Sequence, residues 1–265
     1  MNKKLGFIGC GKMASAIIKG CCGFGNISIK GSEINPDIAQ DAQKRLGIPV
    51  LTDNKAIVID SDVIFIATKP NQVTDVLDEI KSELTEDKLI VSIAAGVNTN
   101  KIENIIGKKR IVRIMPNTPA LVKEGMFGVC KGVYASEEDT EFVISLLSKI
   151  GKCVDITEDK MDIVTAISGS GPAFFYQVIE DMARAGEKLG LDYDKSLLLA
   201  TQTALGSAKM VFDRGETSVK TIIDNVATKG GCTFVGIEAM KENNSSKLFD
   251  EVITKTAQKA SELGK

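Results

Sequence analysis

The sequence predicts an α/β protein in which a doubly wound sheet over residues 1–156 is followed by an all-helical domain over residues 157–265. Three observations support this division. Residues 4–18 contain an apolar run, a glycine-rich turn and then apolar positions at helical spacing. Apolar runs of strand length then alternate with helical segments as far as Ile156. From Glu158 onward the periodicity is helical only.

The glycine-rich turn is the first candidate ligand site. Gly9 permits the tight turn, Gly11 lets a ligand pyrophosphate approach the backbone, and Ala14 is the small residue where helix packs on strand. A glycine turn can also close a β-α unit that binds nothing, so the motif alone is weak evidence. Its place in the first β-α turn favours a dinucleotide, because the start of the helix offers free N–H groups to a pyrophosphate.

Strands and helices alternate through the rest of the first domain. In chain order we expect strand 27–30, helix 36–47, strands 62–68, 88–94, 110–114 and 126–131, helix 136–149, and strand 152–156. Pro36 suits the start of its helix and Gly47 the C-cap. The alternation predicts a parallel sheet that ends near residue 156, with the carboxyl ends of its strands at one edge. Residues 68–70 and 94–96 should therefore lie beside the glycine-rich turn, where Lys69 could reach a phosphate or ribose.

The segment Met-Pro-Asn-Thr-Pro-Ala follows strand 110–114, at residues 115–120. Pro116 and Pro119 are expected to stiffen this loop and to stop it becoming a helix. A rigid connector without any ligand would have the same sequence, so the loop alone does not indicate a site.

Glu33 is the candidate determinant of cofactor choice. The second strand ends at Gly31-Ser32-Glu33, where an acidic residue bonds the adenosine ribose of NAD and repels the 2′-phosphate of NADP. An exposed loop carboxylate would fit the sequence equally well. We therefore expect NADH to be favoured or at least tolerated, and we leave the choice between NADH and NADPH open.

The second domain is expected to contain helices only. They are predicted at residues 172–189, 195–213, 218–227, 233–242 and 247–263. The domain is small, and several of its helix faces are apolar. We therefore expect it to form a homodimer.

Composition excludes several classes of function. A net charge of -2 gives no bias toward nucleic acid, and glycine and proline interrupt the longest uncharged stretch, residues 163–179, so no membrane span is expected. The first strand begins so near Met1 that no signal peptide is expected, which predicts a cytoplasmic protein. Six cysteines without a C-x-x-C pair, and no histidine, predict that no metal is bound. Without histidine, any mechanism also lacks the commonest general acid or base.

Seven segments, taken in order, resemble the pyrroline-5-carboxylate reductases along nearly the whole chain. They are Gly-x-Gly-x-Met-Ala at 9–14, Asn54, Ala-Thr-Lys-Pro at 67–70, Ala-Ala-Gly at 94–96, Met-Pro-Asn-Thr-Pro-Ala at 115–120, Ser-Gly-Ser-Gly-Pro-Ala at 168–173 and Gly-Gly-Cys-Thr at 230–233. The resemblance implies a Rossmann domain and a helical domain that interlocks with its partner in a dimer, and dimers that often join into rings. It also implies hydride transfer from NADPH or NADH to a cyclic imine, giving proline.

The resemblance also assigns residues to the site, between one subunit's cofactor crevice and the paired helical domains. It implies cofactor contacts from Gly9, Gly11, Met13, Asn54, Ala67, Lys69, Ala94 and Asn225; position in the turn and at the strand ends adds Lys12, Ser32, Glu33, Pro70 and Gly96. It places Glu158, Cys232 and Thr233 against the substrate; the small-residue segments add Ser168 and Gly231. Close helix packing would explain Ser168 and its neighbours as well as a substrate wall does.

Thr233 is the candidate catalytic residue. Residues 230–233 immediately precede a helix, so their N–H groups could hold the substrate carboxylate. Thr233 is expected at the N-cap or first position of that helix. Its hydroxyl then either caps the helix or bonds the ring nitrogen and guides a proton to it. A cyclic imine that binds as an iminium is already electrophilic and needs placement more than a strong acid, so a site without histidine suffices.

Three alternatives remain at the level of sequence. The family usually has Ser-Pro where this chain has Thr228-Lys229, and Cys232 replaces the usual Thr or Ala, so another cyclic imine is a possible substrate. A β-hydroxyacid dehydrogenase shares the plan but needs a lysine on the helix after Gly171, and none occupies its first turns. A non-catalytic dinucleotide-sensing or partner-binding protein would keep the fold without turnover.

Overall fold

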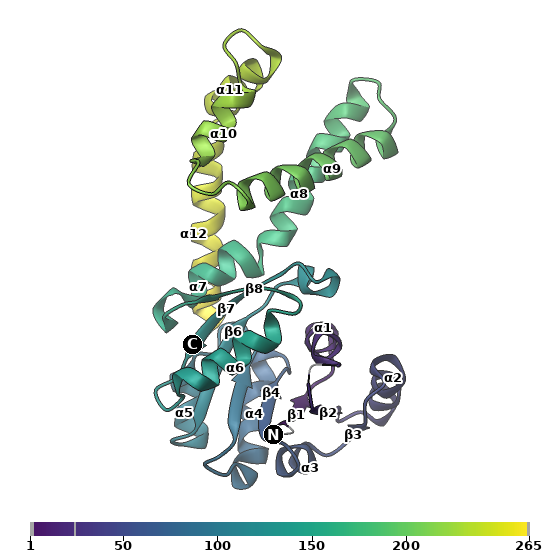
Figure 1. Ribbon diagram of the computed structural model, residues 1–265, viewed down its shortest axis with the longest axis vertical. Coiled ribbons are helices and arrows are strands. Elements are labelled where there is room, and N and C mark those ends of the chain that lie inside the picture. Colours follow the sequence, from purple (N-terminus) through teal and green to yellow (C-terminus); the bar gives the residue numbers. More distant parts are fainter. Residues whose placement is uncertain (1–2, 24, 264–265) are drawn as a thin grey trace. The chain divides into compact units, whose positions relative to one another are not determined.

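The computed structural model describes residues 3–23 and 25–263, which form two compact units (Figure 1). The first unit runs to Ser170 and takes up the chain again from Lys255. The second unit is Gly171–Thr254. The last strand ends at Asp155, so the predicted change from strands to helices is confirmed among the described residues. The first compact unit continues past residue 156 to Ser170, so the end of the sheet and the end of this unit differ. The domain boundary predicted at residue 156 stays a prediction.

An eight-stranded sheet forms the centre of the first unit, in the order β3-β2-β1-β4-β5-β6-β7-β8. Its strands are β1 (Lys3–Ile8), β2 (Ile27–Ser32), β3 (Val50–Leu51), β4 (Val63–Ile66), β5 (Leu89–Ser92), β6 (Arg110–Met115), β7 (Gly125–Lys131) and β8 (Gly151–Asp155). The chain turns back from β3 to β4 on the other side of β1, so the strand order reverses between β1 and β4. Ligands of doubly wound sheets bind at such a switch point.

One strand pair departs from the expected parallel order. β6 and β7 are antiparallel, whereas every other pair in the sheet is parallel. Only residues 116–124 connect them, and a parallel return needs a crossover of a dozen or more residues. The expectation that this loop forms no helix was wrong: Thr118–Val122 is a 3-10 helix, and Pro119 lies in its first turn, where no backbone N–H is needed.

Helices cover both faces of the sheet, with a separate core under each (Figure 1). Alternate strand residues face opposite cores, as the pleat requires: Phe7 stacks on Phe65 in one core, while Ile8 and Ile66 lie in the other. The first unit contains α1 (Lys12–Cys21), α2 (Pro36–Leu46), α3 (Asn54–Ile59), α4 (Val73–Ile80), α5 (Thr99–Ile106), α6 (Glu137–Leu147) and α7 (Met161–Val164), with a π-helix at Thr165–Gly169. The predicted fold class is confirmed.

The ends of α2 are those that the sequence predicts. Pro36 occupies its first turn, the Asn35 side chain accepts hydrogen bonds from two backbone N–H groups, and Gly47 closes the helix with φ of 68°. The two-residue strand β3 and the six-residue helix α3 were not predicted. Elements of this length carry too little periodicity for a pattern of polar and apolar residues to identify them.

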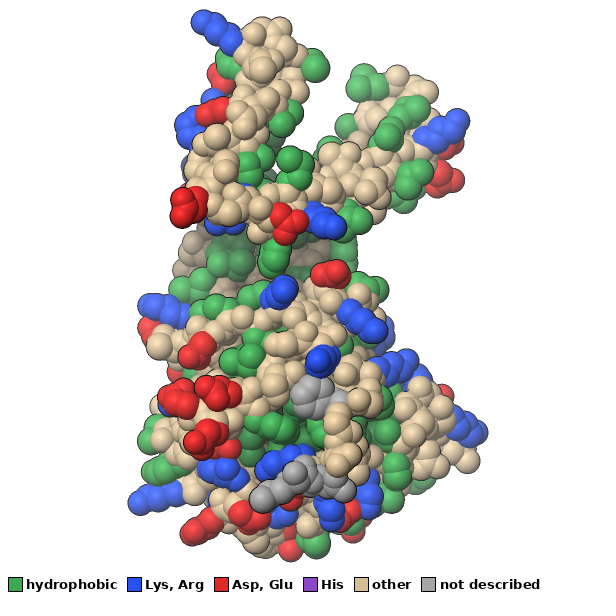
Figure 2. All heavy atoms as spheres, viewed as in Figure 1, with side chains coloured by type: hydrophobic (Ala, Val, Ile, Leu, Met, Phe, Trp, Pro, Cys, Tyr) green, Lys and Arg blue, Asp and Glu red, His purple; other side chains and the backbone are tan. Residues whose placement is uncertain are grey.

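The second unit is helical, as expected. It contains α8 (Gly171–Lys188), α9 (Tyr193–Phe212), α10 (Val219–Val226) and α11 (Cys232–Glu242), and α12 (Ser245–Leu263) begins in this unit and ends in the first. The buried residues in the range 171–254 are few and small: Gly171, Ala183, Ser196 and Ala200. Large apolar side chains are exposed instead, among them Phe175, Leu198 and Phe212, each about two-thirds exposed, and Figure 2 shows apolar side chains along these helices. Among the described residues, no helix combines the length and apolar character that a bilayer crossing requires.

Candidate functional site

The glycine-rich turn lies at the switch point between β1 and β4. Gly9 has φ of 92°, and a Cβ atom there would lie 2.9 Å from the carbonyl oxygen of Ala67. Glycine is therefore required twice, for backbone conformation and for close approach. Gly11 has nothing within 4 Å of its Cβ position and is the N-cap of α1 without a side-chain cap. The turn is thus tight against β4 and open toward solvent, which suits the approach of a ligand pyrophosphate.

The first turn of α1 presents its backbone N–H groups beside this opening. Lys12 and Met13 are its first two residues; Lys12 is exposed, and Met13 packs partly against the core. No acidic side chain lies in that turn to compete for the N–H groups. Gly11, Lys12 and Met13 therefore lie together at one helix start, a place that favours an anion. Their contact with a cofactor stays a prediction.

Arg45 on α2 holds the turn from outside, and sequence reasoning missed it. Its guanidinium donates to the Cys10 carbonyl oxygen at 3.0 Å and also to the Ser15 hydroxyl. Ser15 in turn donates to the Gly11 carbonyl oxygen at 2.7 Å. In the sequence Arg45 is only a cation in the last turn of a helix, a common surface position, so nothing there signals this contact.

Glu33 also bonds the turn. Its Oε1 accepts a hydrogen bond from the Cys10 backbone N–H at 2.6 Å, which brings the carboxylate onto the glycine-rich segment. Burial, and after it the charge of Glu33, raises the pKa of the Cys10 thiol to about 12, so the thiol stays neutral. The carboxylate at the end of β2 is therefore bonded to the glycine-rich turn and is not a free loop side chain. Its predicted contact with the cofactor ribose stays a prediction.

A hydrogen-bonded chain runs from β2 across to α4. The Ser32 hydroxyl donates to Asn54 Oδ1 at 2.7 Å, and Asn54 Nδ2 donates to Glu79 Oε2 at 2.8 Å. Ser32 and Asn54 are both buried. The chain fixes which way the Asn54 amide faces, because each end of the amide already has a partner of the right kind.

A cavity of about 340 Å³ opens beside the turn. Its lining residues are Ile8, Gly9, Ser32, Glu33, Ile34, Asn35, Ile38, Asn54, Thr68, Gln72, Asp75, Val76 and Glu79. The cavity therefore joins predicted site residues that are far apart in the sequence, Gly9, Ser32, Glu33 and Asn54. The structure adds the α4 residues, which the sequence did not indicate. Thr68 contributes a buried hydroxyl oxygen without a partner among the described residues.

The remaining predicted cofactor residues of the first unit follow β4 and β5. Ala67 and Lys69 come directly after β4, and Pro70 starts a short 3-10 helix, Pro70–Gln72. Ala94 and Gly96 come after β5, and Gly96 has φ of 75°. They do not line the 340 Å³ cavity, but β4 pairs with β5, so their positions continue the same sheet edge.

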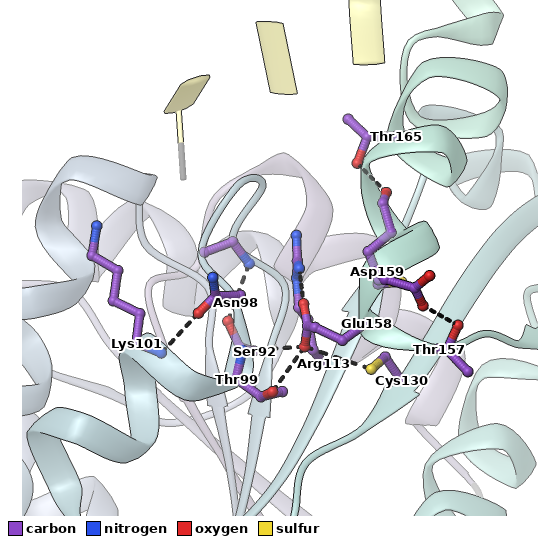
Figure 3. A network of polar contacts seen from close by, with 12 residues as sticks. Ser92, Asn98, Thr99, Lys101, Arg113, Cys130, Thr157, Glu158, Asp159 and Thr165 are labelled. Atoms are coloured by element: carbon purple, nitrogen blue, oxygen red, sulfur yellow. Dashed lines mark hydrogen bonds and ion pairs between the residues drawn. The ribbon is translucent and has the colours of Figure 1, made fainter. Parts of the chain in front are cut away.

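Glu158 has four donors within the first unit (Figure 3). Its carboxylate accepts from the Thr99 backbone N–H at 3.2 Å, the Thr99 hydroxyl at 2.8 Å and the Cys130 thiol at 3.5 Å, and it forms an ion pair with Arg113. Burial raises the pKa of Cys130 to about 12, with a further contribution from the Glu158 charge. The carboxylate joins β6, β7 and α5, and its predicted contact with substrate stays a prediction.

Ser168 lies in the π-helix Thr165–Gly169. Its hydroxyl oxygen is buried without a partner among the described residues. The next residue, Gly169, packs against Met115 so closely that a Cβ atom would come within 2.3 Å of the methionine methyl. Close packing therefore accounts for the glycine, and a role of Ser168 toward substrate stays a prediction.

The other predicted site residues belong to the second unit. Asn225 is an exposed residue of α10, Gly231 is the N-cap of α11, and Cys232 is the first helical residue. The predicted place of Thr233 at the N-cap or first position was wrong, because it is the second residue of α11. The capping alternative fails with it: α11 has no side-chain cap, and the exposed Thr233 hydroxyl has no hydrogen bond to the described part of the chain.

Known proteins resemble this chain over its full length. The family model for pyrroline-5-carboxylate reductase dimerisation matches residues 158–263, and that for NADP oxidoreductase coenzyme F420-dependent matches residues 4–96. The pyrroline-5-carboxylate reductase of Methanosarcina acetivorans is 39% identical, covering 100% of this chain and 99% of that protein. The Coxiella burnetii reductase structure has a TM-score of 0.92 at 32% identity over 100% of both chains. The Plasmodium falciparum structure, with NADP bound, has a TM-score of 0.89 at 33% identity over 100% of this chain and 99% of the other.

Arg45 offers a test of how the turn is held. Replacing it in Arg45→Met removes the bonds to Cys10 and Ser15, so we expect the Kd for NADH, measured by nicotinamide fluorescence, to rise roughly three- to tenfold. Lys44→Met removes one positive charge from the same helix turn and should leave the Kd near wild type. Equal losses in the two variants would assign the effect to net charge and contradict a positioning role.

Proposed function

Because this chain belongs to the pyrroline-5-carboxylate reductase family, we infer that it reduces the ring C=N bond of 1-pyrroline-5-carboxylate to give L-proline. It is an NAD(P)H-dependent oxidoreductase acting on a C=N group. The observation that carries this function is the glycine-rich turn at the switch point, open at Gly11 and beside a cavity, in a chain that matches reductases from end to end.

The first unit supplies the residues that fit a nicotinamide dinucleotide. The N–H groups of Gly11, Lys12 and Met13 would hold its pyrophosphate, and the cavity beside Glu33 would take the adenosine half. Residues 67–70 and 94–96 continue along the strand ends and would support the nicotinamide half. For Asn225, on α10 of the second unit, the family resemblance alone supports a cofactor contact. The reduced nicotinamide supplies the hydride when it is bound.

The start of α11 fits the substrate. The Gly231 N–H already donates to the Thr228 carbonyl oxygen at 2.9 Å. α11 has no side-chain cap, so the N–H groups of its first residues, Cys232 and Thr233, would hold the carboxylate of the imine. The Thr233 hydroxyl would bond the ring nitrogen and keep the proton there. An iminium is already electrophilic, so the site would need to place it and would not need a strong acid. A chain without histidine could therefore carry out the reaction.

The second unit is proposed to form a homodimer. Supporting this are the match of residues 158–263 to a dimerisation family and the scarcity of buried apolar side chains between residues 171 and 254. A second copy would cover side chains such as Phe175, Leu198 and Phe212. A ring of dimers, a cytoplasmic location and activity without a metal ion are further parts of the proposal.

NADH is proposed as an accepted cofactor. The Glu33 carboxylate lies on the glycine-rich turn and lines the cavity that fits adenosine. It can accept hydrogen bonds from ribose hydroxyls, and it repels a phosphate at the 2′ position. The balance between NADH and NADPH then depends on the charges around the whole cavity.

A steady-state assay with pyrroline-5-carboxylate and each reduced cofactor tests the function. We expect cofactor oxidation to require the imine and proline to form in equal amount. Gly11→Val is the control variant: Gly11 has φ of -65° and open space at its Cβ position, so the variant should fold normally. Its side chain would block the pyrophosphate, and activity should fall at least roughly tenfold. Full activity in Gly11→Val would place the cofactor elsewhere.

The Thr233 hydroxyl is tested by three substitutions. Thr233→Ala and Thr233→Val should lower kcat/KM by roughly tenfold or more, whereas Thr233→Ser keeps the hydroxyl and should retain most activity. The Kd for NADH and the Tm should stay near wild type, because the hydroxyl makes no capping bond. Wild-type kcat/KM in the Ala and Val variants would remove Thr233 from the mechanism.

The oligomer is tested by light scattering coupled to gel filtration. We expect a particle mass of at least twice the 28.4 kDa of one chain at micromolar concentration. Substituting Glu for Leu198, which is 69% exposed, should shift the mass toward one chain if this part of α9 lies in the interface. A wild-type protein that remains monomeric at micromolar concentration would contradict the proposal.

A further inference from the structure

We propose that the cavity beside the glycine-rich turn selects against a 2′-phosphate with carboxylates from two separate elements, and that Asp75 and Glu79 on α4 are specificity-determining residues together with Glu33. This inference rests on the proposed cofactor use and deepens it. The carboxylate at the end of β2 is the expected determinant in a doubly wound fold, whereas the two on α4 come from a separate element.

The α4 carboxylates share one face of their helix. Asp75 and Glu79 are four residues apart, so they lie one above the other, and both line the cavity. Val76, between them in the sequence, is buried and lines the cavity too. Glu33 approaches from β2 and the glycine-rich turn. A group bound in the cavity therefore faces acidic side chains from α4 and from β2.

The described residues that line the cavity include no Lys or Arg, so no cation of the lining balances these charges. Arg45, on neighbouring α2, is engaged with Cys10 and Ser15. A phosphate is normally held by Arg or Lys, whose donors offset its loss of hydration. Here a 2′-phosphate would lose hydration without such a partner and would be repelled by three carboxylates. A ribose hydroxyl carries no charge and can donate to any of them.

Two of the three carboxylates are held in place. Glu33 accepts from the Cys10 N–H at 2.6 Å. Glu79 accepts from Asn54 Nδ2 at 2.8 Å, and Asn54, only 3% exposed, is itself fixed by the Ser32 hydroxyl. An unrestrained surface carboxylate can turn into solvent, where water and salt weaken its field. These bonds keep the charges of Glu33 and Glu79 at the cavity.

This arrangement changes what a single substitution can do. Glu33→Ser removes one charge and leaves Asp75 and Glu79, so it should improve NADPH binding only in part. Asp75→Asn with Glu79→Gln removes the α4 charges and nearly preserves side-chain shape. The Gln amide oxygen can still accept from Asn54, so the cavity should remain intact.

The test measures the Kd for NADH and for NADPH by nicotinamide fluorescence, in the full-length wild type and in these variants. Removing the two α4 charges should lower the Kd for NADPH roughly threefold or more, and combining Glu33→Ser should lower it further, while the Kd for NADH changes less than about twofold. Asp78→Asn is the matched control: it is on α4, pairs with Lys81 and does not line the cavity. It should change neither Kd.

Salt gives a second, independent readout. Added NaCl should improve NADPH binding relative to NADH in the wild type and should do so less in the triple variant, because salt screens repulsion. An unchanged ratio of the two Kd values in the α4 variant, or an equal gain for both cofactors, would overturn the inference while the proposed function stands. Failure of the wild type to bind either cofactor would overturn the proposed function and this inference with it.

Discussion

The close approach of the glycine-rich turn to its two neighbouring strands is the constraint on which the site depends. The Gly9 N–H donates to the Ser32 carbonyl at the end of β2, and the Ala67 N–H donates to the Ile8 carbonyl, which ties the same point to β4. A side chain at Gly9 would collide with Ala67. Because the turn is held on both sides, α1 starts at a fixed place, and its N–H groups point into the opening at the switch point.

The electrostatics of the site follow from this placement. One side of the opening has the positive end of α1 and the backbone N–H groups of the turn, which suit a pyrophosphate. The cavity beside it is lined by carboxylates, and one of them, Glu33, is bonded to the turn itself. Under the proposed function, a dinucleotide that carries charge at its pyrophosphate and hydroxyls at its adenosine ribose would match these groups. Cofactor choice would then depend on the same contacts that shape the turn.

The helical unit meets a different constraint. Its four buried residues are small, and aromatic and aliphatic side chains stay exposed on α8 and α9. Burial of apolar surface is the main favourable term in folding, so in the proposed dimer a second chain would supply much of the stability of this unit. Cys232 and Thr233, two of the proposed substrate residues, lie on α11 of this unit, which would link activity to assembly.

The sequence by itself determined the features that a few neighbouring residues encode. The glycine-rich turn, the α2 boundaries at Pro36 and Gly47, the alternation of strands and helices and its end at Asp155 all follow from local conformation and periodicity. The resemblance to known reductases added the reaction, because seven short segments occur in the right order.

Only the tertiary structure decided which side chains meet. Glu33 reaches Cys10 across 23 residues, Arg45 reaches it across 35, and Glu158 reaches Thr99 across 59. Those contacts depend on strand order and on how each helix packs, which no local pattern encodes. The same holds for the carboxylates on α4, which look like ordinary surface residues in the sequence. The antiparallel pairing of β6 with β7 depended on the short connection between the two strands. The place of Thr233 depended on the residue at which α11 begins.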